Sequence, residues 1–438
     1  MAVQDRRACQ TSLGNMLVSM DTAPSRAVGR DVGRDVGGDV VVIGAGPAGM
    51  MAAEVLATAG ITVTLVDGMR SPGRKLLLAG RGGLNLTHSE PMDVMLARYG
   101  SASASLALAI TGFGPTQLRA WSHGLGQPTF VGSSGRVFPQ SMRATPLLRA
   151  WLHRLDDLGV ERITGARFHG WSSAGVPQFD SITVGQRPVL LALGGASWPG
   201  TGSDGGWVDA VRALGIRVNP LRAANSGFVV EWSPLMAQRF AGEPVKNVAL
   251  TFAEHSVRGE LMISARGIEG GAVYALSSAL RAAIDERGPV QVLVDLRPDV
   301  SVERLVDRLG HARNGQSRAN SLRKAAGVAP VGVALMREAH RQLPADPHTL
   351  AALVKAVPLT LTAVMPIARA ISSAGGIALD EVDDTWMLRT LPGTFVAGEM
   401  LDWDAPTGGY LLQATFATAV AAAHGMLKWL DAHPPERR

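Results

Sequence analysis

Two apolar runs near the N-terminus, separated by a glycine-rich turn and an alanine-rich segment, predict a β-α-β unit. Val40–Ile43 is an uninterrupted β-branched run, which is typical of a parallel strand that is covered on both faces. The segment after the turn is rich in Ala and Met and ends at Gly60. A second apolar run, Ile61–Val66, follows and ends on Asp67. This order predicts a strand, a helix and a second strand parallel to the first.

The turn between the first strand and the helix has the spacing G-x-G-x-x-G, with glycines at Gly44, Gly46 and Gly49. In dinucleotide-binding units the first glycine permits the tight turn and the second lets a pyrophosphate approach the backbone. The third lets the helix pack closely on the strand. Pro47 and Ala48 would begin the helix, whose N-terminal dipole and free N–H groups face the phosphates. The turn therefore predicts a dinucleotide site.

Asp67 stands at the end of the second strand, about 20 residues after the first glycine, where a carboxylate hydrogen-bonds a ribose hydroxyl. A negative charge at this point would repel a 2′-phosphate, so FAD or NAD is expected here and NADP is not. The alternative is a β-α-β unit with a glycine-rich turn and no ligand. The sequence favours a ligand, because strand, turn, helix, strand and acid occur in the expected order.

A glycine-rich and polar loop follows Asp67. It contains Gly73, Arg74, Lys75, Gly82 and Asn85. The glycines would let the backbone approach a flat ligand, and the polar side chains would supply hydrogen bonds. Two cations in a solvated turn are the alternative explanation for the Arg-Lys pair. The density of glycine among the polar residues favours a loop that lines a ligand.

A second glycine-rich segment follows the apolar run that begins at Pro188. Gly194 and Gly195 come directly after this run, where doubly wound sheets bind their ligands. Gly200, Gly202 and Gly205 repeat the G-x-G-x-x-G spacing. We reject a second nucleotide-binding domain, because these glycines lie too far from the strand and no acid ends the next strand. A turn that closes over the first cofactor is expected instead.

The C-terminal segment supplies a third glycine-rich region. We call the three regions, at 44–49, 194–205 and 398–409, the glycine stations. Gly398 and Glu399 end a predicted strand with an acid that would hold a polyol. The run Thr407, Gly408, Gly409, Tyr410 then opens an alanine-rich helix, whose N-terminal dipole would stabilise the negative charge of a reduced flavin. The alternative is a C-terminal helix that only packs on the sheet.

Residues 226–365 differ in character from the segments on either side. Apolar alternation predicts strands at Phe228–Trp232, Val245–Ala253 and Val290–Leu296. Helical spacing predicts Ser301–Leu309, Ala319–Ala326, Gly332–Gln342 and Thr349–Val357, a helical piece at about 300–357. We interpret 226–365 as an inserted substrate or cap domain, and 39–225 with 366–438 as a discontinuous cofactor domain. The low-complexity residues 1–38 are expected to be unfolded. The predicted fold class is α/β, a Rossmann-like two-part domain with a β-rich insert.

Composition narrows the chemistry further. The chain of 438 residues has a single cysteine, Cys9, which excludes a disulfide framework, a cysteine-based zinc site and a flavin disulfide-reductase mechanism. No metal site is predicted. The net charge is +5 and the pI about 9.8, but the basic residues are scattered, which weighs against nucleic acid as a partner. With no signal peptide and no apolar run long enough to span a bilayer, a soluble, cytoplasmic protein is expected.

The three glycine stations together resemble the FAD-binding halves of the flavoprotein superfamily that includes fumarate reductase. More narrowly, residues 39–430 resemble the BaiN/YhiN-type family of NAD(P)/FAD-dependent, aminoacetone-oxidase-like flavoproteins. The motifs that carry the likeness are Gly73-Arg-Lys, Gly80-Arg-Gly-Gly-Leu-Asn-Leu-Thr, Gly135-Arg-Val-Phe-Pro, Gly194-Gly-Ala-Ser-Trp-Pro, Gly398-Glu, Asp402, Thr407-Gly-Gly-Tyr and Gln413. Many relatives read Gly-Gly-Arg-Cys-Asn where this chain has Arg81-Gly-Gly-Leu-Asn, so chemistry that relies on that cysteine is in doubt.

The resemblance implies an FAD-dependent oxidoreductase acting on a small molecule. It places the N-terminal glycines at the pyrophosphate, Glu399 at the ribityl chain, and Thr407 to Tyr410 at the isoalloxazine. Electrons would come from transiently bound NADH or NADPH, or from an oxidisable substrate. Candidate catalytic or substrate-binding residues are Arg81, His88, Arg136, Arg266 and Tyr410. An RNA-modifying flavoprotein and a flavin-binding protein without turnover are the alternatives.

Overall fold

The computed structural model describes residues 34–311 and 317–434. Most of the segment expected to be unfolded, residues 1–33, therefore lies outside the described residues. Its last part differs from the expectation, because β1 (Arg34–Asp35) pairs in parallel with β10 (Ile182–Thr183). Val36 follows with only 1% of its surface exposed. This apolar side chain extends the ordered structure to a point before residue 39.

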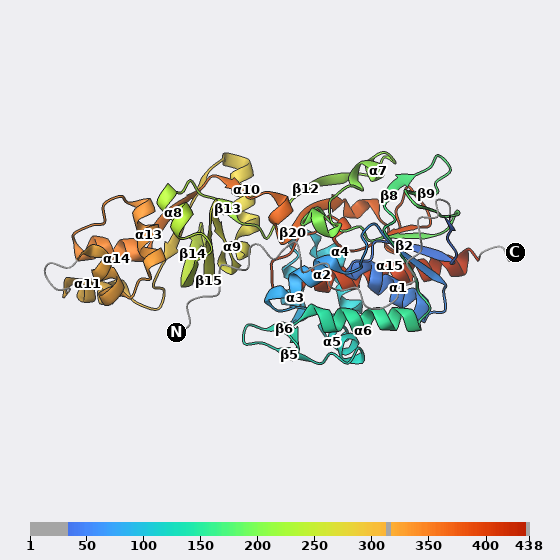
Figure 1. Ribbon diagram of the computed structural model, residues 1–438, viewed down its shortest axis with the longest axis horizontal. Helices are drawn as coiled ribbons and strands as arrows, with labels where there is room; N and C mark the ends of the chain where they lie inside the picture. The colour runs from blue at the N-terminus through green and yellow to red at the C-terminus, as the bar shows by residue number, and fades with distance from the viewer. Residues whose placement is uncertain (1–33, 312–316, 435–438) are drawn as a thin grey trace.

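A five-stranded parallel sheet forms the centre of the larger lobe (Figure 1). In spatial order its strands are β21 (Thr394–Val396), β11 (Val189–Leu191), β2 (Val40–Ile43), β3 (Val63–Asp67) and β7 (Glu161–Thr164). Helix α1 (Pro47–Thr58) connects β2 to β3, as the apolar pattern predicts. The α/β, Rossmann-like fold class is confirmed.

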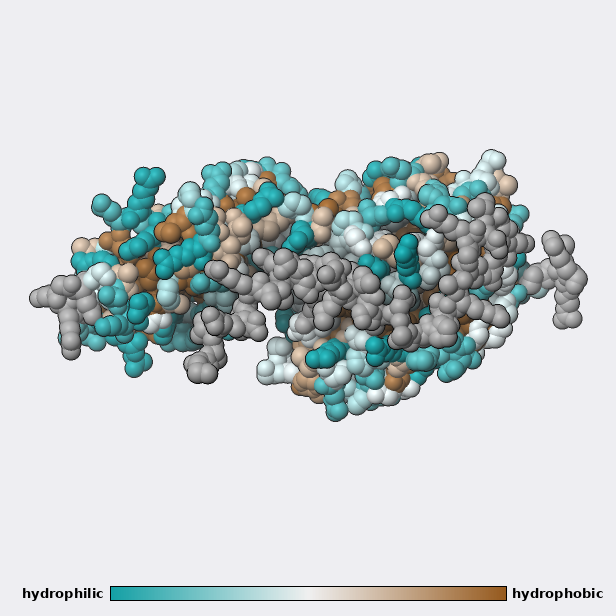
Figure 2. Space-filling model, viewed as in Figure 1, coloured by the Kyte–Doolittle hydropathy of each residue, from teal (hydrophilic) through white to brown (hydrophobic). Residues whose placement is uncertain are grey.

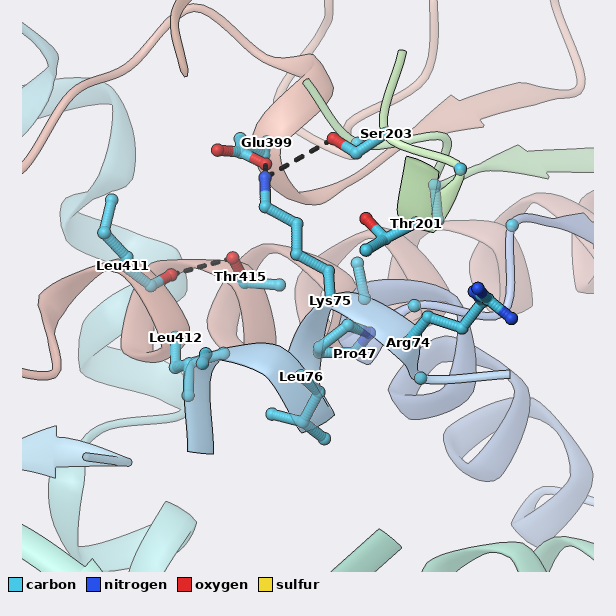
Figure 3. Close-up of a pocket in the computed structure, with 18 of the residues that line it drawn as sticks. Pro47, Arg74, Lys75, Leu76, Thr201, Ser203, Glu399, Leu411, Leu412 and Thr415 are labelled. Atoms are coloured by element: carbon cyan, nitrogen blue, oxygen red, sulfur yellow. Dashed lines mark hydrogen bonds and ion pairs between the residues drawn. The ribbon is translucent and has the colours of Figure 1, made fainter. Parts of the chain in front are cut away.

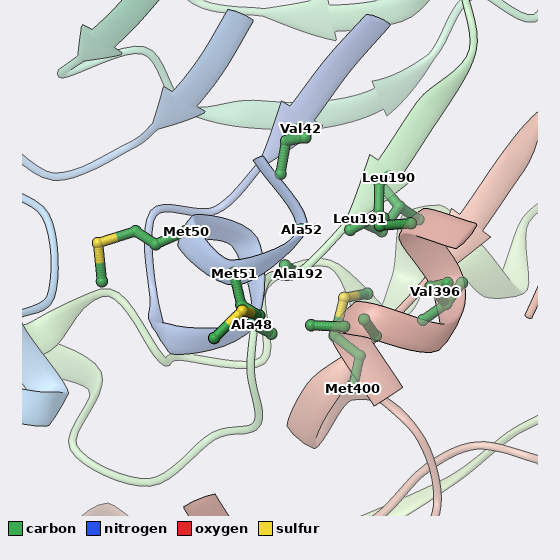
Figure 4. Packing of buried hydrophobic residues seen from close by; sticks show 14 of the residues in the cluster. Val42, Ala48, Met50, Met51, Ala52, Leu190, Leu191, Ala192, Val396 and Met400 are labelled. Atoms are coloured by element: carbon green, nitrogen blue, oxygen red, sulfur yellow. The ribbon is translucent and has the colours of Figure 1, made fainter. Parts of the chain in front are cut away.

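Helix α1 packs against the long C-terminal helix α15 (Tyr410–Ala432) and against the sheet. Small side chains on both helices allow this close approach, including Ala52 on α1 and Ala417 on α15, which have no exposed surface. Figure 4 shows Met51 and Met400 beside the ends of β11 and β21. The N-terminal and C-terminal segments thus share one hydrophobic core.

The remaining elements of this lobe surround the sheet. The helices are α2 (Arg74–Ala79), α3 (Met92–Ala97), α4 (Ser103–Gly112), α5 (Pro115–Gly124), α6 (Ala144–Asp157) and α7 (Val208–Arg212). Short strands are β4 (Thr87–His88), β5 (Thr129–Val131), β6 (Arg136–Pro139), β8 (Phe168–Trp171) and β9 (Pro177–Phe179). Leu147, Trp151 and Leu155, at helical spacing, form a buried stripe along α6.

The smaller lobe has a separate hydrophobic core, built between Phe228 and Leu361, around an antiparallel sheet. The sheet order is β18 (Val357–Leu361), β17 (Val290–Asp295), β14 (Pro244–Phe252), β15 (His255–Ser264), β16 (Gly267–Glu269), β13 (Phe228–Val229) and β19 (Ala363–Val364). On the face shown in Figure 2, hydrophilic residues are spread over both lobes.

The helices of the smaller lobe are α8 (Pro234–Arg239), α9 (Gly271–Ala275), α10 (Ser277–Arg287), α11 (Val302–Gly310), α12 (Arg318–Ser321), α13 (Pro330–Ala339) and α14 (Pro347–Lys355). Ser301 caps α11 and Asp346 caps α14 through side-chain oxygens that accept backbone N–H groups. Helical spacing predicts both helices, but α14 begins and ends two residues before its predicted bounds.

An antiparallel pair joins the two lobes, β12 (Val218–Ala224) with β20 (Ser372–Ile377). Asn225 follows β12 with a positive φ of 48° and 3% exposure. Its amide donates to the Ser372 hydroxyl at 3.0 Å and to the Ala405 carbonyl at 2.7 Å. Hydrogen bonds from Asn225 therefore join the segment where the chain leaves the larger lobe to the loop that precedes α15.

Candidate cofactor site

A cavity lies between the start of α1, the loop after β3, the turn after β11 and the start of α15. Most of the residues expected to bind the cofactor lie in its wall: Gly44, Gly46, Pro47, Ala48, Asp67, Gly73, Arg74, Lys75, Asn85, Gly194, Glu399, Thr407, Gly408 and Gly409. Five others do not line the cavity: Gly49, Gly82, Gly195, Gly398 and Tyr410. The structure thus brings the three glycine stations to one place.

The three glycines of the dinucleotide turn differ in what a side chain would meet. A Cβ at Gly44, whose φ is +105°, would lie 2.3 Å from the Ala192 carbonyl oxygen. A Cβ at Gly49 would lie 1.8 Å from the Gly44 carbonyl oxygen. A Cβ at Gly46 would have nothing within 4 Å. The first and third positions are thus closed by packing, while the second faces the open space that a pyrophosphate needs.

Asp67 holds the same turn from the end of β3. One carboxylate oxygen accepts the Ala45 N–H at 2.6 Å and the other accepts the Met69 N–H at 2.7 Å. Burial raises the pKa of Asp67, and the two N–H groups and Arg74 partly offset that effect. The carboxylate therefore couples the glycine turn to the loop after β3.

Lys75 crosses the cavity from α2 to the C-terminal segment (Figure 3). Its Nζ donates to Glu399 Oε2 at 2.6 Å and to the Ser197 hydroxyl at 2.7 Å. Glu399, in the 3₁₀ turn η7 (Gly398–Met400), also accepts the Ser373 N–H at 2.9 Å. Arg74, the residue before Lys75, points away from this ion pair. The adjacent cations Arg74 and Lys75 thus point to different parts of the cavity.

Two polar atoms in the wall are buried and have no hydrogen-bond partner among the described residues, Arg74 Nε and Asn85 Oδ1. Such atoms are costly unless a ligand satisfies them. One is a donor that suits a phosphate oxygen, and the other is an acceptor that suits a ring N–H. FAD carries both groups, so the residues present fit this cofactor.

The N-terminus of α15 closes the opposite side of the cavity. A Cβ at Gly409, whose φ is +100°, would lie 2.5 Å from the Thr87 carbonyl carbon. The Thr87 hydroxyl donates to Gln413 Oε1 at 2.7 Å, and Gln413 is fully buried. Strand β4 therefore lies directly against the first turn of α15. The C-terminal Gln413 motif is explained by this packing.

The candidates for catalysis are placed differently from one another. Of these residues, Arg136 lines the cavity and is exposed. Arg266 is exposed in the turn between β15 and β16, outside the cavity wall. The side chain of Arg81 lies outside what the structure describes. His88 Nε2 lies 2.9 Å from the Ser134 carbonyl oxygen, while its Nδ1 accepts the Glu90 N–H at 3.2 Å.

Tyr410 contacts residues that the sequence patterns do not single out. Burial, followed by the neighbouring Glu90 carboxylate, raises the pKa of the Tyr410 hydroxyl to about 12. Burial alone would raise the pKa of Glu90, but hydrogen bonds from Arg98 and Tyr410 lower it below its ordinary 4.5. Glu90 and Arg98 are isolated charged residues in sequence, so no local signal could have identified them.

Leu84 stands where the resemblance drawn from the motifs implies a cysteine. It lines the cavity with 1% of its surface exposed. The turn expected to close over the cofactor also reaches the wall, through Thr201, Gly202 and Ser203. Trp207 and Trp403 line the cavity as well, although no glycine or acid pattern marks them.

The parallel sheet, the glycine turn with its open second position and the second helix N-terminus at one cavity define a Rossmann-type dinucleotide-binding protein. The chain belongs to the HI0933-like family: the model of the HI0933-like protein Rossmann domain matches residues 38–425. This confirms the family resemblance drawn from the motifs. The protein is accordingly an oxidoreductase of this FAD-dependent family.

Two curated relatives match nearly the whole chain. The 3-dehydro-bile acid delta(4,6)-reductase of Clostridium scindens is 27% identical over 402 residues, 87% of this chain and 97% of the relative. The ribosomal RNA dihydrouridine synthase of Escherichia coli is 26% identical over 414 residues, 88% of this chain and 97% of the relative. The two are similar to this chain to the same degree.

Among solved structures, E. coli quinol fumarate reductase matches with a TM-score of 0.49 and 15% identity, covering 92% of this chain and 72% of that one.

Within residues 34–311 and 317–434, no helix combines the length and apolarity needed to cross a membrane.

Proposed function

We propose that this protein uses FAD to reduce an electron-poor carbon–carbon double bond in a small organic substrate. The observation that carries the proposal is the cavity, in which a glycine turn with an open second position shares one space with two unsatisfied polar atoms. The names of the two relatives support the reaction type. A delta(4,6)-reductase and a dihydrouridine synthase are both named for adding hydrogen across a carbon–carbon double bond.

Bound FAD, once reduced, would supply two electrons as a hydride and return to the oxidised form, and the chain's residues would bind and orient the reactants. One substrate carbon receives the hydride and the other a proton, which converts the double bond to a single bond. The Arg136 guanidinium at the wall is suited to an anionic or carbonyl group on the substrate. Leu84 has no proton to give, so this chain's proton comes from another group or from water.

The test begins with the cofactor and then follows the reaction. Purified protein should be yellow and release FAD on denaturation. Chemically reduced protein, mixed without oxygen with an enone such as a 3-oxo-Δ4 steroid acid, should regain the oxidised flavin spectrum as a product two mass units heavier appears. Leu84→Cys serves as a comparison for the proton source. A protein that takes up no FAD, or a reduced protein that no activated alkene reoxidises, would contradict the proposal.

We further propose that NADH or NADPH reduces the flavin by transient binding. The second G-x-G-x-x-G stretch supports transient binding, because its residues line the cofactor cavity and do not follow a strand as a separate nucleotide site would. Rapid mixing with each nucleotide should bleach the flavin absorbance and show which donor is used. Bleaching by neither nucleotide would indicate that another donor supplies the electrons.

RNA is the second candidate substrate. It is favoured by one relative, which is named for dihydrouridine in ribosomal RNA, and by the net charge of +5. Reduced protein would then convert a uridine in an unmodified ribosomal RNA transcript, detected as a gain of two mass units on one nucleotide. Binding of the transcript should weaken steeply with salt, because basic residues displace counterions from phosphates. Reoxidation by enones but not by the transcript would decide for the small molecule.

A further inference from the structure

Tyr410 is held by four residues of the segment 88–99, which we call the Tyr410 clamp: His88, Glu90, Arg98 and Tyr99. The His88 and Tyr410 rings are stacked with centroids 5.3 Å apart and an interplanar angle of 22°. The guanidinium carbon of Arg98 lies 5.8 Å from the centre of the Tyr410 ring. The Tyr99 hydroxyl donates to the Tyr410 carbonyl oxygen at 2.8 Å. Both the side chain and the backbone of Tyr410 are thereby fixed.

Glu90 is the centre of the clamp. Its two carboxylate oxygens accept from Arg98 Nε at 3.1 Å and from Arg98 Nη2 at 3.0 Å, a bidentate pair. The same carboxylate acts on Tyr410, because it raises the pKa of the Tyr410 hydroxyl. The Glu90 N–H donates to His88 Nδ1, so the imidazole is held in place by the same residue. Each member therefore supports the others.

The clamp acts on a residue that lies between two parts of the cavity wall. Gly408 and Gly409 before Tyr410, and Leu411 and Leu412 after it, line the cavity, whereas Tyr410 itself does not. The first N–H groups of an α-helix have no partner within the helix, and they give its N-terminus a partial positive charge. Fixing Tyr410 therefore fixes this charge at the cavity.

We propose that the Tyr410 clamp sets the reduction potential of the bound FAD by holding the N-terminus of α15 against the cofactor. This inference rests on the proposed binding of FAD. A reduced flavin carries more negative charge than the oxidised form, so a fixed positive dipole stabilises the reduced form more. Tyr410 is then a positioning residue, and His88, with both ring nitrogens engaged, supports it instead of transferring protons.

The test compares the midpoint potential of the FAD-bound protein with that of two variants. Tyr410→Phe keeps the ring stack and removes the hydroxyl from Glu90, and Glu90→Gln removes the charge at the centre of the clamp. Each should weaken the stabilisation of reduced over oxidised flavin at least about tenfold, which lowers a two-electron potential by about 30 mV. The double variant should shift the potential by less than the sum of the two single shifts, because both substitutions act on the same clamp.

The chain provides a matched control. Tyr274→Phe, on α9 of the smaller lobe, removes a tyrosine hydroxyl that is not in the cavity wall. Its potential should equal that of the wild type. An unchanged potential in both clamp variants with FAD bound, or an equal shift in Tyr274→Phe, would overturn the inference. A wild-type protein that binds no FAD would overturn the proposed function too, which distinguishes the two failures.

Discussion

Gly46 and Gly49, both in the dinucleotide turn, differ in the space around them. Substitutions at these two positions should therefore distinguish an effect on FAD binding from an effect on folding stability. Gly46→Ala places a methyl group in the open space of the cavity, where it meets no protein atom within 4 Å. We expect the free energy of unfolding of the apoprotein to change by less than about 0.5 kcal/mol. The Kd for FAD should rise at least about tenfold, or about 1.4 kcal/mol, because the methyl group occupies the approach of the pyrophosphate.

Gly49→Ala is the counterpart to this variant. Its methyl group would meet the Gly44 carbonyl oxygen at 1.8 Å, so the overpacked turn should lose about 1–3 kcal/mol of stability. Urea unfolding of the apoproteins and fluorescence titration with FAD measure the two effects. Equal destabilisation by both substitutions would refute the distinction.

The dependence of folding stability on pH, at acidic pH, tests the role of the single residue Glu90. The pKa of Glu90 is lowered in the folded state. Its contribution to the free energy of unfolding is therefore present above pH 4.5, and it is lost as the pH falls through the pKa of the folded state. Glu90→Gln, which resembles the protonated acid, should have a lower Tm than the wild type near neutral pH. The difference should shrink towards zero below pH 4.5, as followed by thermal melts. A difference that is independent of pH would argue against the ionised carboxylate.

The residues predicted from sequence and those found by structure differ in kind. Gly44, Gly46 and Asp67 belong to a local pattern with fixed spacing, so they could be predicted to meet at one turn. Tyr410 and Tyr99 are separated by 311 positions, and their hydrogen bond depends on how α15 docks. Arg266, a candidate for substrate binding, lies in an exposed turn of the smaller lobe and is not in the cavity wall, so its role stays a prediction.

At the scale of elements, the Lys75–Glu399 ion pair joins α2 to the turn η7, which come from opposite ends of the chain. Both side chains are largely buried, with 26% and 17% exposed. Lys75→Met leaves the carboxylate without its cation, so the free energy of unfolding should fall by about 1–3 kcal/mol. The double variant Lys75→Met/Glu399→Gln should recover part of this loss in urea unfolding. A loss in the double variant that equals the sum of the single losses would mean that the pair is not coupled.

Helices and strands could be predicted from the sequence where one face of the element is wholly buried. Strand β2 has four buried residues in succession, and α6 carries a continuous apolar stripe. Strand β15 escaped prediction because exposed residues such as His255 and Glu260, together with Gly259, interrupt its apolar pattern. It is stabilised by pairing with β14 along its length, which depends on a partner strand and not on its own composition.

At the scale of the whole molecule, the insert should be separable from the cofactor domain. Its entry and exit strands, β13 and β19, pair directly, with Phe228 opposite Val364. The ends of 226–365 are therefore neighbours, and the segment has its own core. Expressed alone, residues 226–365 should unfold in one cooperative transition and bind no FAD, as followed by circular dichroism and fluorescence titration.

The complementary variant joins 39–225 to 366–438 through a short glycine linker. It should still bind FAD, because the cavity wall lies in these two segments. Its stability should be lower, since the Arg281–Asp404 ion pair between the lobes is lost. An isolated insert without cooperative unfolding would contradict the proposed domain boundaries.

The division of the cofactor domain between the two ends of the chain has a consequence for synthesis on the ribosome. The core of the insert is complete once Leu361 has emerged, whereas β21 and α15 are still to be translated. Until then the apolar side of α1 that α15 covers has no partner, and it is open to chaperones. The wall of the cavity is therefore complete only after the start of α15 has emerged, and a product cut short before Tyr410 lacks the lining residues Leu411, Leu412 and Thr415.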